Sequence, residues 1–159
     1  MAEYAIDFIE RNKDEEFFVY FPMALTHGPF EPTPDDAEFA NFNPPSNSEE
    51  ARNAQALYGV HSGGDVDDPE TWYGSMVQYH DKVIGRVNDK LEELGIAENT
   101  LVIYVGDNGT PTEVCNIRHN HMTSCGGKGL TLDRGTHVPM ICSWPGTIPS
   151  GSVPTDLVD

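Results

Sequence analysis

A long amphipathic pattern followed by a short apolar run constrains the fold of this chain most. Apolar residues recur at helical spacing through residues 71–94, and Gly95 follows as a natural helix end. The run LVIYVG at 101–106 predicts a strand covered on both faces, because it offers no polar side to water. The helical stripe consists of Met76, Val77, His80, Val83, Ile84, Val87, Leu91 and Leu94. A helix that leads into a buried strand indicates an α/β fold.

Further segments extend this pattern on both sides. Residues 3–13 predict a helix, while EEFFVYFP at 15–22 and VPMICSWPG at 138–146 predict strands. The order of these elements predicts a mainly parallel sheet flanked by helices. Residues 31–70 and 109–137 predict long loops of the kind that often carry function. The apolar face of the first helix is expected to contain Tyr4, Ala5, Phe8 and Ile9.

The charge of the chain restricts its partners. The 159 residues include 26 acidic and 9 basic ones, for a formal net charge of −17. We therefore expect no nucleic-acid or membrane partner, because both surfaces are anionic. No apolar run approaches the roughly 18 residues that span a bilayer, and the N-terminus lacks the basic start of a signal peptide. An anionic substrate would be repelled at long range, so its site must contain local cations.

Polar residues stand where two predicted strands end. Asp107 and Asn108 follow the strand at 101–106, and His27 follows the strand at 15–22. Ligands of parallel sheets sit beyond the carboxyl ends of the strands. Asp and Asn oxygens suit calcium or magnesium, although Asp-Asn-Gly is also an ordinary turn sequence. His27 could protonate a leaving group or simply cap the strand end.

A glycine-framed lysine follows the Asp-Asn pair along the chain. Lys128 stands in the sequence Gly-Gly-Lys-Gly, where flanking glycines let backbone approach a ligand closely. Its compact positive charge could hold an oxyanion beside a metal. The alternative is an ordinary surface lysine in a loop.

The cysteines leave several alternatives open. Cys115, His119, His121 and Cys125 form a C-x3-H-x-H-x3-C run that could bind zinc, although its spacing matches no common zinc pattern. A disulfide between Cys115 and Cys125 is a second reading, and free thiols are a third. Cys142 leaves at least one odd thiol. Other polar residues are expected to be structural or solvated, with a loop calcium site as an alternative for the acidic ones: His61, His80, Asp35, Asp36, Asp65, Asp67 and Asp68.

Three stretches together resemble the sulfatase family of the alkaline-phosphatase-like superfamily. They are THGPF at 26–30, YHDKVIGRVNDKLEELGIAENTLVIYVGDNG at 79–109, and GGKGLTLDRGTHVPMICSWPGTIPSG at 126–151. The resemblance implies an α/β fold and hydrolysis of a sulfate-ester small molecule or sulfated glycan. It also implies that Asp107 and Asn108 bind a divalent metal, calcium or else magnesium, while His27 and Lys128 contact the sulfate.

The chain departs from the family pattern in several places. The family nucleophile is a formylglycine made from a C/S-x-P-S/A-R motif, and that motif is absent from these 159 residues. The paired metal-binding aspartates and the smaller C-terminal subdomain of the family are absent too. Residues 1–159 are therefore expected to form one partial sulfatase catalytic domain, inactive on its own. Around Lys128 the family pattern changes at Leu132, Asp133, Arg134 and His137, where Tyr, Glu, Gly and Arg are usual.

Two other functional classes remain open. The chain could be a non-enzymatic acidic α/β module that binds calcium or a partner protein, or a phosphoesterase or phosphonate hydrolase of the same superfamily. An open sheet edge would also favour self-association. The family resemblance implies a periplasmic, extracellular or lysosomal location.

Overall fold

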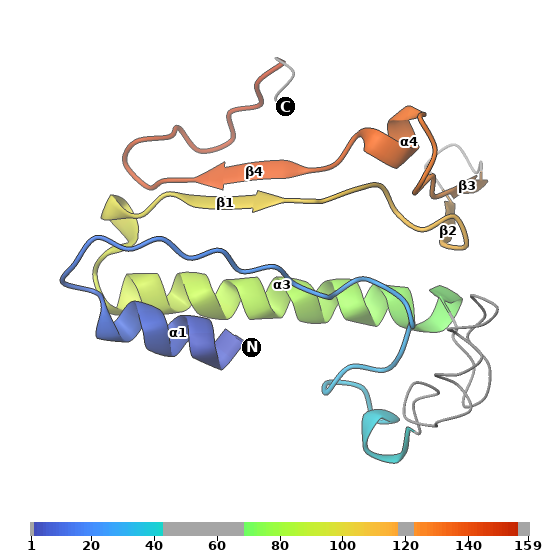
Figure 1. Ribbon diagram of the computed structural model, residues 1–159, viewed down its shortest axis with the longest axis horizontal. Helices are drawn as coiled ribbons and strands as arrows, with labels where there is room; N and C mark the ends of the chain where they lie inside the picture. Colours follow the sequence, from blue (N-terminus) through green and yellow to red (C-terminus); the bar gives the residue numbers. More distant parts are fainter. Residues whose placement is uncertain (1, 43–68, 118–122, 156–159) are drawn as a thin grey trace.

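The computed structural model describes residues 2–42, 69–117 and 123–155, and it is an α/β structure (Figure 1). In Figure 1, α1 and α3 lie together below the β1–β4 pair, while β2, β3 and α4 gather at one end. The elements are α1 (Ala2–Arg11), η1 (Phe39–Asn41), α3 (Pro69–Glu93), η3 (Ala97–Asn99), β1 (Val102–Val105), β2 (Cys115–Ile117), β3 (Thr123–Cys125), α4 (Asp133–Thr136) and β4 (Met140–Ser143). No helix in the described ranges is long and apolar enough to cross a membrane.

Helix α3 confirms the predicted helix and its end. The stripe buries Met76, Val83 and Leu91. Gly95 follows the helix with a φ of 70°. The Ile96 N–H donates to the Leu91 carbonyl at 3.0 Å and the Gly95 N–H donates to the Glu92 carbonyl at 2.9 Å. These bonds form a Schellman motif, in which a glycine at positive φ closes the helix.

Helix α1 packs on α3 with a different face from the one expected. Ala2, Ala5 and Ile9 are buried, but Tyr4 and Phe8 are exposed. Glu3 forms an exposed ion pair with Arg86 of α3. The predicted helix is confirmed, while Tyr4 and Phe8 were wrong as core residues because the α3 contact lies on the alanine side.

The expected strand at 15–22 is not a strand in the structure. Residues 16–24 carry no helix or strand, and in Figure 1 they run past α3 in the same direction as β1. Phe18 and Tyr20 are 85% and 80% exposed. A strand needs a hydrogen-bonded neighbour, and no described segment pairs with this one. The segment has the apolar residues of a strand but lacks the hydrogen-bonded neighbour that a strand needs.

Strands β1 and β4 form an antiparallel pair, so the predicted mainly parallel sheet was wrong for the described residues. Val102 pairs with Ser143 and Val105 with Met140. The β2–β3 pair is antiparallel as well. These two pairs differ from the sequence expectation because the order of helices and strands alone does not fix strand direction.

Only one face of β1 is covered within the described part of the chain. Tyr104 meets His80 of α3 edge to face, with ring centroids 5.7 Å apart. On the opposite face Ile103 and Val105 remain 53% and 57% exposed. The expected burial of both faces was therefore wrong here. Self-association through this sheet stays a prediction.

The partial burial of His80 on α3 should make the stability of the fold depend on pH. Burial lowers the pKa of His80 from its ordinary 6.5, and the neighbouring Asp81 opposes this only in part. The unfolded chain then takes up a proton at higher pH than the folded one, so the free energy of unfolding should fall as pH drops below about 6.5. His80→Phe should reduce this loss while keeping the ring contact. Urea unfolding at about pH 7.5 and about pH 5.5 measures it; an unchanged acid loss would contradict the prediction.

The loop that follows residue 30 is tied to α3 by polar contacts. Asp36 accepts hydrogen bonds from the Thr33 N–H at 2.7 Å and from the Ser75 hydroxyl at 2.9 Å. Asp35 forms an ion pair with Lys82 at 2.7 Å. The expected solvated surface was wrong for Asp36, which is half-buried, whereas Asp35 is exposed as expected. Asp65, Asp67, Asp68 and His61 lie outside the described residues.

The buried core lies where this loop, α3 and the segment after β1 meet. Phe30, Met76 and Val114 form its centre. The partly buried residues packed against it are Leu25, Trp72 and Tyr73. Val114 belongs to the region 109–137, which was expected to be a loop but also contains β2, β3 and α4. The core thus anchors the segment that leads away from the end of β1.

Candidate functional site

The Asp-Asn-Gly turn at the end of β1 is fixed by its neighbours on both sides. The Gly106 N–H donates to the Pro139 carbonyl and the Gly109 N–H to the Gly135 carbonyl, both at 3.0 Å. The turn between these bonds leaves Asp107 exposed and Asn108 half-buried. The pair lies just after the end of β1, as the sequence predicted. It also forms the turn that was the alternative interpretation.

The lysine loop lies directly beside this turn. The backbone N–H groups of Gly127 and Lys128 both donate to the Thr110 carbonyl at 3.0 Å. Gly129 adopts a φ of 83°, a conformation that favours glycine. Lys128 itself is half-buried. The structure therefore brings the Lys128 backbone to a residue that lies two positions after Asn108.

Glycines make this close approach of loops achievable. A Cβ on Gly109 would lie 2.1 Å from the Arg134 carbonyl oxygen. One on Gly126 would lie 2.1 Å from the Pro111 oxygen, and one on Gly135 would lie 2.2 Å from the Leu130 oxygen. Real Cβ atoms do not approach backbone so closely. Each of these positions therefore requires the absence of a side chain, and the loops pack backbone against backbone.

His27 lies in a turn that precedes the core residue Phe30. Its N–H donates to the Ala24 carbonyl at 2.9 Å, and its ring Nδ1 lies 2.7 Å from the Gly28 oxygen. A carbonyl only accepts, so this contact assigns the hydrogen to Nδ1 and leaves Nε2 as the outward nitrogen. Phe30, three residues later, packs against Val114. His27 is exposed.

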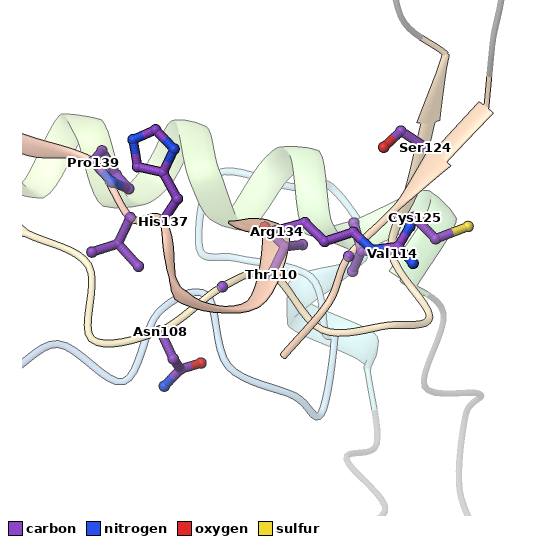
Figure 2. Close-up of a pocket in the computed structure, with 11 residues that line it drawn as sticks. Asn108, Thr110, Val114, Ser124, Cys125, Arg134, His137 and Pro139 are labelled. Carbon is purple, nitrogen blue, oxygen red and sulfur yellow. The ribbon is translucent and has the colours of Figure 1, made fainter. Parts of the chain in front are cut away.

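A cavity of about 310 Å³ lies between the turn, the β3 end and α4 (Figure 2). Asn108 lines it, together with Thr110, Ser124, Arg134 and His137. His27, Asp107 and Lys128 do not. Figure 2 shows Arg134 extending toward Cys125, while Asn108 and the His137 ring point to opposite sides. The cavity thus contains one predicted site residue.

Arg134 and His137 are cavity residues that motif reasoning did not assign to the site. They appeared in the sequence only as departures from a family pattern. The useful signal would have been charge, because Arg134 is one of 9 basic residues in a chain with 26 acidic ones. A rare cation close to Lys128 in sequence is a candidate for binding an anion in its own right.

The donor set at the turn fits a hard divalent cation in part. A carboxylate and an amide oxygen stand on adjacent residues, and Asp107 forms no ion pair with any described cation. Calcium takes about six to eight oxygen ligands. In the described ranges no cluster of three or more His, Cys, Asp or Glu residues could hold a metal. The chemistry of Asp107 and Asn108 suits the ion, and further ligands would have to complete its shell.

Cys115 and Cys125 form a disulfide across the β2–β3 pair. These residues face each other in the strand register and are 10 positions apart in the sequence. The disulfide reading is therefore the one found among the three alternatives. Zinc would need these sulfurs as thiolates, so the zinc reading was wrong; His119 and His121 lie outside the described residues. Cys142 is a free thiol, as the odd count required.

Comparison with known proteins places the chain in a family. The model of the sulfatase family matches residues 1–157. The chain is 31% identical over 156 residues to a steryl-sulfatase of Rattus norvegicus, covering 95% of this chain and 22% of that protein. It is 29% identical over 148 residues to an arylsulfatase of Hemicentrotus pulcherrimus, covering 92% and 22%.

A third relative extends this comparison to another named activity. An N-acetylgalactosamine-6-sulfatase of Canis lupus familiaris is 28% identical over 156 residues, covering 96% of this chain and 24% of that protein. The chain therefore spans under a quarter of the length of these three relatives. The match includes the Asp-Asn-Gly turn and the lysine loop, since both lie within residues 1–157. The chain belongs to the sulfatase family.

Proposed function

We propose that this chain supplies one half of the active site of a sulfate-ester hydrolase, as the central-to-C-terminal part of a catalytic domain. The observation that carries the proposal is the meeting of two family segments at Thr110. Its carbonyl accepts from the N–H of Lys128, and it stands two residues after Asn108. The family match over residues 1–157 and the sulfatase names of the relatives support sulfate esters over phosphate esters.

In this proposal Asp107 and Asn108 hold a divalent metal, calcium or else magnesium. The bound ion would supply positive charge that polarises the sulfate oxygens. Asp107 is exposed at the turn and Asn108 lines the cavity, so neither residue is closed off from an ion. The glycines on either side of the pair hold the turn to the Gly135 and Pro139 backbone.

Lys128 and His27 act on the sulfate group itself. The ammonium of Lys128 would contact a sulfate oxygen and offset the field of a chain with net charge −17. His27 presents Nε2 outward, because its Nδ1 faces the Gly28 carbonyl. In the imidazolium form, the proton on Nε2 would pass to the leaving alcohol oxygen.

The nucleophile of the reaction would come from outside these 159 residues. No C/S-x-P-S/A-R motif occurs in them, so the family's formylglycine cannot form here. We therefore expect no turnover of an aryl sulfate by the purified chain. Measurable turnover that follows the chain through purification would contradict this part of the proposal.

Calcium binding tests the half-site directly. Titration of the chain with calcium, followed by amide NMR, should shift the signals of residues 107–109 with an affinity in the millimolar range or weaker, because the shell is incomplete. Asp107→Asn should abolish these shifts. Asp133→Asn, which removes an exposed carboxylate from α4, should leave them unchanged. Micromolar binding that survives Asp107→Asn would favour the non-enzymatic calcium module instead.

A further inference from the structure

Arg134 lies over the lysine loop in close contact with its backbone. A Cβ on Gly127 would lie 2.5 Å from Cγ of Arg134. Because Gly127 has no side chain, the aliphatic stem of the arginine can lie against the residue that precedes Lys128. The Arg134 carbonyl oxygen meanwhile faces Gly109 on the other side. The backbone and the start of the side chain of Arg134 therefore lie between the two loops of the proposed active site, while the residue remains exposed to solvent.

The charge of Arg134 is not neutralised within the described part of the chain. Ion pairs engage Arg11, Lys82, Arg86 and Lys90 with carboxylates. Among the other described cations, Lys13 lies in the turn after α1, whereas Lys128 and Arg134 lie beside the Asp107–Gly109 turn. In a chain of 26 acidic residues, two cations without a carboxylate partner at one place favour an external anion.

The cavity beside Arg134 has the chemistry of an anion subsite. None of the described residues that line it is acidic, while Thr110 and Ser124 contribute hydroxyl groups. Val138 and Pro139 contribute apolar surface on which the hydrocarbon face of a sugar could pack. A guanidinium presents a planar fork of donors that matches the oxygens of a carboxylate or a sulfate.

We propose that this cavity binds a second anionic group of a multiply charged sulfated substrate, with Arg134 as the residue that recognises it. The inference rests on the proposed function, in which Lys128 holds the sulfate that is cleaved. It selects a substrate class within sulfate esters: a sulfated glycan with a neighbouring carboxylate or second sulfate, rather than a neutral molecule with a single sulfate.

The test compares sugar probes by NMR titration of the 159-residue chain. The probes are a monosulfated neutral sugar, the same sugar linked to a uronic acid, its disulfated form, and the unsulfated uronic acid disaccharide. The wild-type chain should bind the doubly charged probes about five- to tenfold more tightly than the monosulfated one, as expected for one partly exposed charge-assisted contact. Whichever of the two doubly charged probes gains more affinity over the monosulfated sugar shows whether the second anionic group is a carboxylate or a sulfate.

Variants locate the source of this preference. Arg134→Gln should abolish the preference and leave the affinity for the monosulfated sugar unchanged, whereas Arg134→Lys should keep part of it. Arg11→Gln is the matched control, because it removes the same charge from an exposed site on α1 and should change nothing. A preference that survives Arg134→Gln, or no preference in the wild-type chain, would overturn the proposal.

Lys128→Gln separates this inference from the proposed function. It should weaken binding of every sulfated probe and spare the unsulfated disaccharide. If Lys128→Gln has no effect while Arg134→Gln still weakens binding of the uronic acid, the assignment of the sulfate site fails and the anion subsite stands.

Discussion

Replacing Phe30 with alanine is expected to lower the free energy of unfolding by about 3–5 kcal/mol. The Phe30 side chain is 0% exposed and lies in the core with Met76 and Val114. Its ring also meets Tyr73 edge to face, with centroids 5.8 Å apart. Removing the ring would leave a cavity between α3 and the segment before β2, and neither of them can move enough to fill it. Urea unfolding followed by circular dichroism measures the loss.

Phe39→Ala provides the matched control for this substitution. Phe39 is 49% exposed in η1, so its loss should cost within about 1 kcal/mol. Phe30→Ala should also disturb the cavity at a distance, because the Val114 carbonyl accepts from the Gly126 N–H at 2.9 Å. A shifted Gly126 amide signal would report this coupling. An equal loss of stability for both variants would contradict the central role of Phe30.

Elements with a strong local pattern could be predicted from the sequence. Helix α3 repeats its apolar residues over several turns and ends at Glu93, two residues before Gly95, so the pattern and the stop agree. Strands β1 and β4 lie inside the predicted runs at 101–106 and 138–146. In contrast, β2, β3 and α4 are only three or four residues long. Such short elements depend on the disulfide and on backbone contacts rather than on periodicity.

Burial of the apolar segments could not be predicted from their composition. Phe18 and Ile103 lie in sequences typical of buried strands, yet both side chains are exposed in the described structure. An apolar pattern shows that a segment favours burial, but it does not identify the element that covers it. The direction of β4 against β1 likewise depends on the path of residues 106–139, which no pattern in that stretch specifies.

Residues of the proposed site could be predicted where they directly follow a strand in the sequence. They could not be predicted where only a contact between loops brings them to the site. Asp107 and Asn108 stand directly after an apolar run, which indicates their position at the end of β1. The Lys128 backbone lies beside them through its hydrogen bond to Thr110, a contact that the glycine pattern did not specify. Arg134 carries no motif, and only the Gly127 contact reveals its place. A single charged residue becomes interpretable once its distance to a second loop is known.

Gly109→Ala should destabilise the protein by about 2–3 kcal/mol, the upper range for inserting one methyl group into a packed site. The new Cβ would lie 2.1 Å from the Arg134 oxygen and 2.8 Å from the Gly135 Cα, and both are backbone atoms that cannot rotate away. The two loops must therefore separate, and the 3.0 Å hydrogen bond from the Gly109 N–H to the Gly135 carbonyl should be lost. Urea unfolding measures the change.

Gly85→Ala gives a control of opposite sign for Gly109→Ala. Gly85 lies inside α3, and its added Cβ would meet nothing within 4 Å. Alanine there should stabilise the helix by roughly 0.5–1 kcal/mol. Because Gly109→Ala moves the turn that carries Asn108, it should also weaken the calcium-dependent shifts at residues 107–109, which Gly85→Ala leaves intact. Wild-type stability in Gly109→Ala would show that the turn and the Arg134–Gly135 backbone are not in contact, and the proposed half-site would lose its geometric basis.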